Sequence, residues 1–259
     1  MRTITNVIVG LAFLFSYTSI QAQKNQTPAS HPVSPTGLTG LPFAEVTLDS
    51  PGLVATKIVL AHYTLPSPDP NLNDTFLIKM RITISEGGDV EAAKVTKYPG
   101  GDHGADELYA PALEAIRQWK FEPYATKGHT KRVAATFFLR FVPDDRVSLD
   151  GGLKDKSASV AGQPIEMTYP EAMSTITRLV IPAYPKEAME MHLSGLGFVD
   201  VIIGKNGEVV DVKKVRAHPL IADATVNAIR QWRFEPHKLN GEPIEVSTEV
   251  EILFDQTEP

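Results

Sequence analysis

Cysteine is absent from the 259 residues of this sequence. Its absence excludes disulfide bonds, thiolate metal sites and lipid attachment through an amino-terminal cysteine. It also leaves open whether the protein works in an oxidising or a reducing compartment.

Positive charge is in deficit. The chain has 25 Lys and Arg against 31 Asp and Glu, a formal net charge of -6. A nucleic-acid-binding protein normally presents a basic face, so this balance argues against DNA or RNA as a partner.

Catalytic and metal-binding patterns are also lacking. The seven histidines show no metal-ligand spacing and no His-Glu-x-x-His motif. The Gly100–Gly104 loop lacks the Lys-Ser/Thr of a phosphate loop, and no serine lies in a nucleophile elbow. Asp102 and His103 form a lone acid–histidine pair in that loop, which is typical of solvated side chains. We therefore predict a protein that is not an enzyme and needs no metal or cofactor.

Long apolar runs are limited to one stretch near the start, Val7–Ile20. As a helix, its 14 residues reach about 21 Å, short of a bilayer core of about 30 Å. Arg2 precedes the stretch and Ala22 follows it, a pattern typical of an export signal over residues 1–22. We expect an exported protein, either cleaved after Ala22 or held in a membrane by an uncleaved leader.

The sequence does contain a nine-residue string written twice. Ala115–Pro123 reads Ala-Ile-Arg-Gln-Trp-Lys-Phe-Glu-Pro and returns 113 positions later as Ala228–Pro236, with Arg for Lys. Both tryptophans of the protein, Trp119 and Trp232, lie in it. A repeat of this kind predicts duplication of a whole structural unit. Each copy reads as the end of a helix whose tryptophan is a core anchor, followed by an extended phenylalanine, Phe121 or Phe234.

The residues around each string follow the same order of expected elements. A strand, a tight turn, a return strand, a helix and a last strand are expected in both units. Trp119 to Phe141 and Trp232 to Phe254 span the same 22 residues. The expected strands are 78–85, 90–96 and 137–141 in the first unit and 199–203, 209–215 and 244–254 in the second, whose helix is expected at 220–232.

The predicted fold class is α+β, with two tandem small domains, each a three-stranded antiparallel sheet packed on one or two helices. The expected organisation is a leader at 1–22, a proline- and glycine-rich tether at 23–42, a first domain at 43–143, a linker at 144–165 and a second domain at 166–259. A strand over Lys57–Leu60 is expected ahead of the first hairpin.

Several of these residues resemble the TonB carboxyl-terminal domain family. The second unit shows Tyr184-Pro185 before a short helix, the Asn206-Gly207 turn and a helix that ends in Trp-Arg-Phe-Glu-Pro. The resemblance covers residues 180–255 well and 76–142 less completely. It implies a small sheet with helices on one face, in a periplasmic protein that binds the TonB box of outer-membrane transporters by strand addition to its last strand.

Carried onto this chain, the resemblance implies partner-binding residues on the last strand and at the Tyr-Pro motif, with the tryptophans and phenylalanines as structural core. The first set is Tyr184, Pro185, Glu245, Val246, Ser247, Thr248, Glu249, Val250, Glu251 and Ile252; the second is Trp119, Phe121, Trp232 and Phe234. A covered edge, or one paired in a homodimer, is the alternative.

The first unit lacks a matching Tyr-Pro helix, which makes its own binding doubtful. Two functions stay open. One is an energy transducer that also contacts inner-membrane motor proteins. The other is a soluble exported tandem adaptor, or self-associating module, with no motor role.

Overall fold

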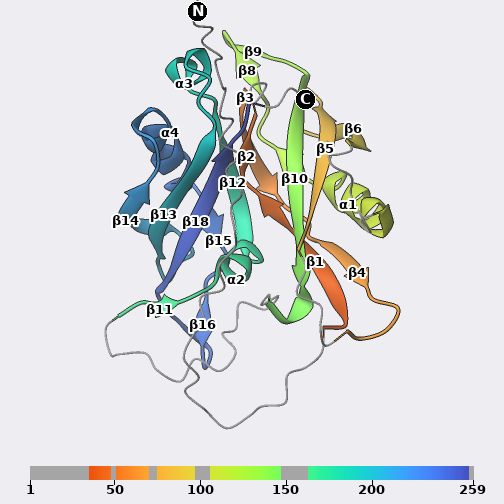
Figure 1. Cartoon of the computed structure of the whole chain (residues 1–259), viewed down its shortest axis with the longest axis vertical. Helices are drawn as coiled ribbons and strands as arrows, with labels where there is room; N and C mark the ends of the chain where they lie inside the picture. Colours follow the sequence, from red (N-terminus) through yellow and green to blue (C-terminus); the bar gives the residue numbers. More distant parts are fainter. Residues whose placement is uncertain (1–34, 48–50, 70–74, 97–105, 147–162, 257–259) are drawn as a thin grey trace, which may run out of the picture. The chain divides into compact units, whose positions relative to one another are not determined.

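The computed structural model describes residues 35–47, 51–69, 75–96, 106–146 and 163–256. The expected leader, the first part of the tether and the loop at 99–104 lie outside these ranges. The described residues belong to one compact unit that begins at residue 33. Its architecture is mixed α+β with mostly antiparallel sheets, which confirms the predicted fold class (Figure 1).

The first half of the chain builds a five-stranded sheet. Its strands are β1 (Gly37–Phe43), β4 (Ala61–Thr64), β5 (Phe76–Ile84), β6 (Val90–Val95) and β10 (Val133–Pro143), in the order β4-β1-β10-β5-β6. The alternating residues Ile78, Met80 and Ile82 are buried, as the period of a half-buried strand predicts. Helix α1 (Tyr109–Ile116) covers this apolar face after a short 3₁₀ turn, η1 (Asp106–Leu108).

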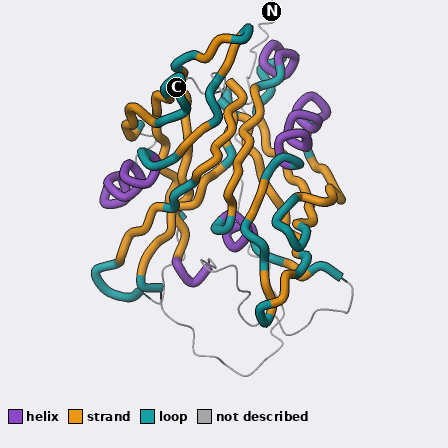
Figure 2. Tube along the Cα trace, turned by 180° about the vertical axis from the view of Figure 1, so that it is seen from behind, coloured by secondary structure: helices purple, strands orange, loops and turns teal. Residues whose placement is uncertain are grey.

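The second half repeats the central part of this arrangement. Strands β13 (Gly195–Ile203), β14 (Val209–Arg216) and β18 (Val246–Phe254) lie in the order β18-β13-β14, which matches β10-β5-β6. Helices α3 (Lys186–Glu190) and α4 (Pro219–Ile229) accompany this sheet. Figure 2 shows from behind that strands run through the middle and that helices lie along the two sides.

A third sheet joins the two halves. Its order is β15 (Arg233–Phe234), β12 (Ile176–Ala183), β3 (Pro51–Lys57) and β7 (Lys120–Phe121). At its centre β12 and β3 pair antiparallel, with Val180 opposite Val54. The two segments expected as separate domains thus share a sheet. The expected strand at Lys57–Leu60 is misplaced, because β3 ends at Lys57 and residues 58–60 are not in a strand.

The repeated string performs the same structural task in both halves. The indole Nε1–H of Trp119 donates to the carbonyl of Val59 at 2.8 Å, and that of Trp232 donates to the carbonyl of Val180 at 2.9 Å. Both tryptophans are fully buried. A buried indole whose N–H has an acceptor contributes its full apolar area without leaving a polar group unpaired.

The phenylalanine two residues later closes over the hairpin turn. The N–H of Phe121 donates to the carbonyl of Gly88, and that of Phe234 to the carbonyl of Gly207, at 2.9 Å in each case. Both glycines have positive φ, 92° and 80°. A Cβ at Gly207 would lie 1.8 Å from the carbonyl oxygen of Phe234. Only glycine fits this close approach.

The prediction of a tether over residues 23–42 is wrong at its carboxyl end, where strand β1 begins at Gly37. Residues 37–42, which the sequence places in a solvated tether, belong to this strand, and Leu38 and Leu41 are buried. A strand that is buried on both faces needs no alternation of polar and apolar side chains. Because β1 contains glycines and a proline and lacks this alternation, its sequence does not indicate a strand.

The remaining short elements complete the described fold. They are β2 (Glu45–Val46), β8 (Ala125–Thr126), β9 (His129–Thr130), η2 (Asp144–Arg146), β11 (Ile165–Glu166), α2 (Tyr169–Met173), β16 (Lys238–Leu239) and β17 (Glu242–Pro243). Strands β8 with β9 and β16 with β17 form small hairpins, and β11 and β2 both pair with β18. The last two positions bear directly on the candidate site.

Candidate functional site: the outer flank of β18

Strand β18 is the last strand of the second sheet and carries the residues expected to bind a partner. Its side chains alternate: Val246, Val250 and Ile252 are fully buried, whereas Glu249 is exposed. One long side of the strand pairs with β13 from Gly195 to Ile203. We call the opposite side the outer flank of β18.

Backbone groups of alternate residues point to this outer flank. The carbonyls of Glu245 and Ser247 accept hydrogen bonds from Ile165 (3.0 Å) and Met167 (2.8 Å), and the N–H of Leu253 donates to Ala44 (2.9 Å). Successive residues of a strand direct their N–H and C=O groups to opposite sides. The backbone groups of the intervening Glu249 and Glu251 therefore also point outward, away from β13.

Two short strands of the same chain cover the ends of the outer flank. β11 pairs with Val246–Ser247 and β2 pairs with Leu253–Phe254, both in parallel orientation. Among the described residues, no strand pairs with this side of the five residues from Thr248 to Ile252. The edge expected to be open from Glu245 to Ile252 is thus paired at its start and just beyond its end, and among the described residues only its middle lacks a strand partner. Two-residue strands carry no periodicity, so the sequence could not predict this cover.

Helix α2 contacts β18 beside this open stretch. Its N-cap is a capping box: the Thr168 N–H donates to the Glu171 carboxylate at 2.8 Å, and the Glu171 N–H donates to the Thr168 hydroxyl at 3.4 Å. This cap ends the extended segment of β11 and starts the helix. Ala172 and Met173 of α2 are completely buried.

An arginine from the first half reaches the same place. Arg140 of β10 forms an ion pair with Glu251. Its guanidinium carbon lies 4.0 Å from the ring centroid of Phe43 and 5.5 Å from that of Tyr169. Burial raises the pKa of the Tyr169 hydroxyl, while the nearby Arg140 lowers it. Sequence reasoning missed Arg140, because it reads as one polar interruption of an apolar strand.

The equivalent flank in the first half carries a longer strand. There β10 pairs with β5 on one side and with β1 on the other. The β1 pairing is antiparallel and runs over six residues, from Leu38 opposite Pro143 to Phe43 opposite Phe138. By the 113-residue offset of the repeat, these positions of β10 correspond to 251–256. The first half therefore carries a six-residue strand at the end of the flank where the second half has only β2, and no described strand pairs with this side of residues 133–137.

The Tyr-Pro motif lies at one end of the site rather than along its open stretch. Tyr184 is buried, its hydroxyl donates to the Leu193 carbonyl, and its ring packs edge-on against Phe254 with centroids 5.6 Å apart. Pro185 is the N-cap of α3. The two residues fix the chain between β12 and β13 against the end of β18.

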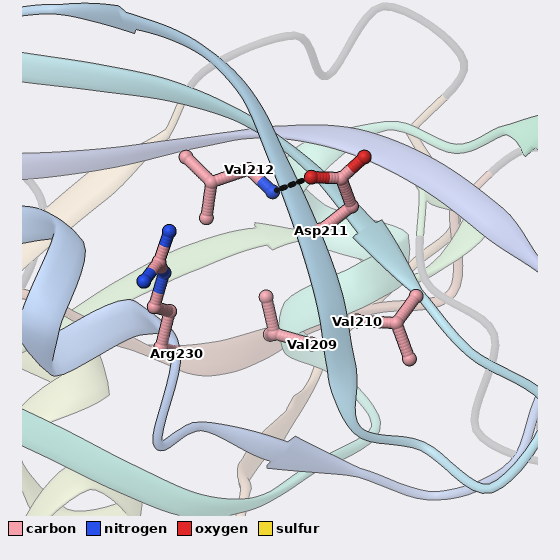
Figure 3. Close-up of a pocket in the computed structure, with 5 residues that line it drawn as sticks. All are labelled: Val209, Val210, Asp211, Val212 and Arg230. Atoms are coloured by element: carbon pink, nitrogen blue, oxygen red, sulfur yellow. Dashed lines mark hydrogen bonds between the residues drawn. The ribbon is translucent and has the colours of Figure 1, made fainter.

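The other edge of this sheet, β14, has a hollow of about 360 Å³. Val209, Val210, Asp211, Val212 and Arg230 line it. Figure 3 shows Arg230 on one side of the strand and the Asp211 carboxylate turned to the other, where it accepts from the Val212 N–H at 2.8 Å. Lys213 holds the pKa of Asp211 below its usual value through their direct interaction.

Two features make β14 a poor edge for strand addition. Its pairing with β13 shifts register twice, between Asp200 and Val201 and between Ile202 and Ile203. Two exposed lysines, Lys213 and Lys214, lie in the second half of the strand. Bulges and lysines are the devices by which natural sheets protect an edge from pairing. The outer flank of β18 is the better candidate.

A buried histidine anchors the far end of α2. The Thr175 hydroxyl donates to the Ala172 carbonyl at 2.9 Å and lies 3.1 Å from Nε2 of His237. The hydroxyl proton is already used, so Nε2 must carry the proton and donate. Among the described residues Nδ1 of His237 has no hydrogen-bond partner. Burial lowers the pKa of His237, opposed by the Glu171 carboxylate.

Two further properties are limited to the described ranges. Within them, no group of three or more His, Cys, Asp or Glu side chains could hold a metal ion. None of the helices described is both long and apolar enough to cross a bilayer.

Comparison with known proteins bears on the second half of the chain. Residues 181–255 match the family model described as Gram-negative bacterial TonB protein C-terminal. This match contains β13, β14, α4 and β18, and it begins in β12. It covers one copy, and the first half is not matched as a second. No curated protein matches the chain.

Proposed function

We propose that this protein is a non-enzymatic, TonB-like component of transport in the periplasm that binds an extended peptide segment of an outer-membrane transporter as an added strand on the outer flank of β18. The observation that carries the proposal is the pairing of β1 with β10. The strand equivalent to β18 already accepts a six-residue strand on the same flank, at positions 138–143, which correspond to 251–256 of the second half. The match of residues 181–255 to the TonB family supports the choice of partner.

The binding energy in this proposal comes from backbone groups. A strand laid beside Thr248–Ile252 meets the outward N–H and C=O groups of Glu249 and Glu251. Such pairing tolerates many side chains, and specificity arises where alternate side chains find pockets. On the core side, the strand is supported by the side chains of Val246, Thr248, Val250 and Ile252. The backbone groups that point to the partner are those of Glu245, Ser247, Glu249 and Glu251.

Tyr184 and Pro185 have an indirect role in this proposal. Tyr184 holds the start of β13 and the end of β18 together through Leu193 and Phe254. Replacing it with phenylalanine keeps the ring and removes the bond to Leu193. We expect a small loss of stability and little change in peptide affinity.

The test measures binding to ten-residue peptides taken from the periplasmic amino-terminal segments of outer-membrane transporters, together with a peptide of residues 36–44 of this chain. Glu249→Pro removes an outward N–H without touching the ladder to β13. Glu249→Ala keeps the N–H and removes only the side chain, including its bond to Arg216. We expect micromolar binding by the wild type, near-wild-type binding by Glu249→Ala and at least tenfold weaker binding by Glu249→Pro. Equal binding by the two variants contradicts the proposal.

A second candidate function follows from the origin of β1. Because the strand on β10 comes from the chain itself, the same flank of β18 can take a strand from a second copy, as in an exported adaptor that self-associates without a motor. This candidate predicts a mature chain that begins at Gln23 and a dimer broken by Glu249→Pro. Mass spectrometry of the native amino terminus, with sedimentation of both variants, distinguishes it from a membrane-held transducer.

A further inference from the structure

The segment Ile165–Met173 lies where the proposed partner strand has to begin. β11 and the residue after it are hydrogen-bonded to the outer flank, among others from the N–H groups of Ile165 and Met167 to the carbonyls of Glu245 and Ser247. The capping box then turns the chain into α2 after only two paired residues. We call Ile165–Met173 the resident segment.

The resident segment has a shorter ladder than β1, the strand on the corresponding flank of the first half. β1 pairs with β10 over six residues and with β4 over four. β11 pairs with one neighbour over two residues. The hydrogen bonds of this two-residue ladder are far fewer than those of β1, so they set a smaller barrier to exchange. Burial of Met167, Ala172 and Met173 adds the rest of the attachment.

A longer incoming strand can form more backbone hydrogen bonds with the outer flank of β18 than the resident segment does. The resident segment uses the outward carbonyls of Glu245 and Ser247, and no described strand uses the backbone groups of Glu249 and Glu251 on this side. A partner strand that starts beside Ser247 can continue to Glu251. The exchange replaces a two-residue ladder with a longer ladder along the same flank.

From this geometry we infer that the resident segment is a built-in competitor for the outer flank of β18: a partner strand binds fully only after β11 and α2 have left it. The inference rests on the proposed function and adds its regulation. The Arg140–Glu251 pair, beside the Tyr169 ring, marks the point where α2 and the first half meet the flank. Release of α2 uncovers this part of the flank for the partner.

A disulfide lock tests the inference directly. Glu166 and Ser247 are opposite each other in the parallel pairing, and both lie at least partly at the surface. Because the chain has no cysteine, Glu166→Cys combined with Ser247→Cys creates a single pair that can join β11 to β18. The probe is a synthetic peptide of residues 36–44, which contains the strand that lies on the equivalent flank of β10. We expect the oxidised form to bind it at least tenfold more weakly than the reduced form.

A variant that weakens the attachment of α2 tests whether releasing the resident segment raises peptide affinity. Thr168→Ala removes the capping box of α2 and is expected to raise the affinity for the same peptide about three- to tenfold. His218→Ala is the matched control, because it removes the N-cap acceptor of α4, away from the outer flank. We expect no gain of affinity in this control.

The outcomes separate the two proposals. If the oxidised and reduced double-cysteine forms bind equally well, the resident segment is not a competitor, and the proposed function stands. If Thr168→Ala and His218→Ala change affinity equally, the gain is not specific to α2 and the inference fails. If no form binds the 36–44 peptide or any transporter peptide, the proposed function fails and the inference falls with it.

Discussion

The equivalent strands β10 and β18 of the two halves have different neighbours on their outer flanks. In the first half β10 lies between β5 and β1, so its outer flank is filled along six residues by the chain's own strand. In the second half β18 lies beside β13, and its outer flank carries β11 and β2 over two residues each. The difference is one of length: the flank holds one six-residue strand in the first half and two two-residue strands in the second, which is the basis for proposing that the second half exchanges its strands.

The halves are also tied together, so the comparison is made within one folding unit. β3 of the first half pairs with β12 of the second, and Arg178 forms an ion pair with Glu122 across this boundary. Glu122 also donates its N–H to the Val54 carbonyl, while Glu235 donates to the Thr175 carbonyl. A strand shared at the centre makes stability a joint property of both halves.

The largest effect is expected from filling the hairpin glycines. Gly88→Ala and Gly207→Ala each place a Cβ at 2.0 or 1.8 Å from a carbonyl oxygen, with φ of 92° or 80°. We expect each to lower the free energy of unfolding by about 3 kcal/mol or more, since strain and a backbone clash add. Chemical denaturation followed by tryptophan fluorescence measures this. A single transition that shifts in both variants supports one unit, and two separate transitions contradict it.

The second effect compares β1, which pairs with the outer flank of β10, with β11, which pairs with the outer flank of β18. Leu41→Ala in β1 removes a side chain that is 1% exposed and is expected to cost about 2–5 kcal/mol. Ile165→Ala in β11 removes one that is 8% exposed at the end of a weakly held segment. We expect it to cost about 1 kcal/mol or less, as at a site that opens locally. Similar losses in the two variants contradict the difference between the halves.

The third effect is a pH dependence confined to the second half. His237 is neutral in the fold with a pKa below its ordinary 6.5, so the unfolded chain binds its proton more readily. Its contribution to stability is complete above about pH 6.5 and is lost as the pH falls through the lower folded pKa. The first half has Tyr124 at the equivalent position. We expect His237→Gln to flatten the fall in midpoint denaturant concentration between neutral and mildly acidic pH; an unchanged profile contradicts this assignment.

The smallest effect is expected from the ion pair between Arg140 and Glu251. Their side chains are 26% and 20% exposed, so solvent screens much of the attraction. A double-mutant cycle with Arg140→Gln and Glu251→Gln is expected to give a coupling energy of about 0.5–1 kcal/mol. A coupling indistinguishable from zero removes the pair as a link between the halves.

Sequence reasoning reached the parts of the fold that repeat and alternate. The strands at Ile78–Ile84 and Val209–Val215, the turns at Gly88 and Gly207 and the helix before Trp232 all follow periodicity or turn chemistry that is local to the chain. The indole bonds of the tryptophans could not be predicted, because their acceptors, Val59 and Val180, lie far away in the sequence.

The candidate site was predictable only in part. The alternation of Val246, Thr248 and Val250 marks a half-buried last strand. The cover of its flank is not visible in the sequence, since β11 and β2 are too short to show a period and pair across long separations. The same limit hid β1 and β12, whose positions depend on tertiary pairing rather than on local propensity.

The most direct measurement is residue-resolved amide hydrogen exchange of the wild type with and without the bound peptide. We predict that the amides of Glu249 and Glu251 become at least tenfold more protected from exchange when the peptide binds, while those of Ile165 and Met167 lose protection. Binding that leaves these four amides unchanged, or that protects β14 instead, contradicts strand addition at the outer flank of β18.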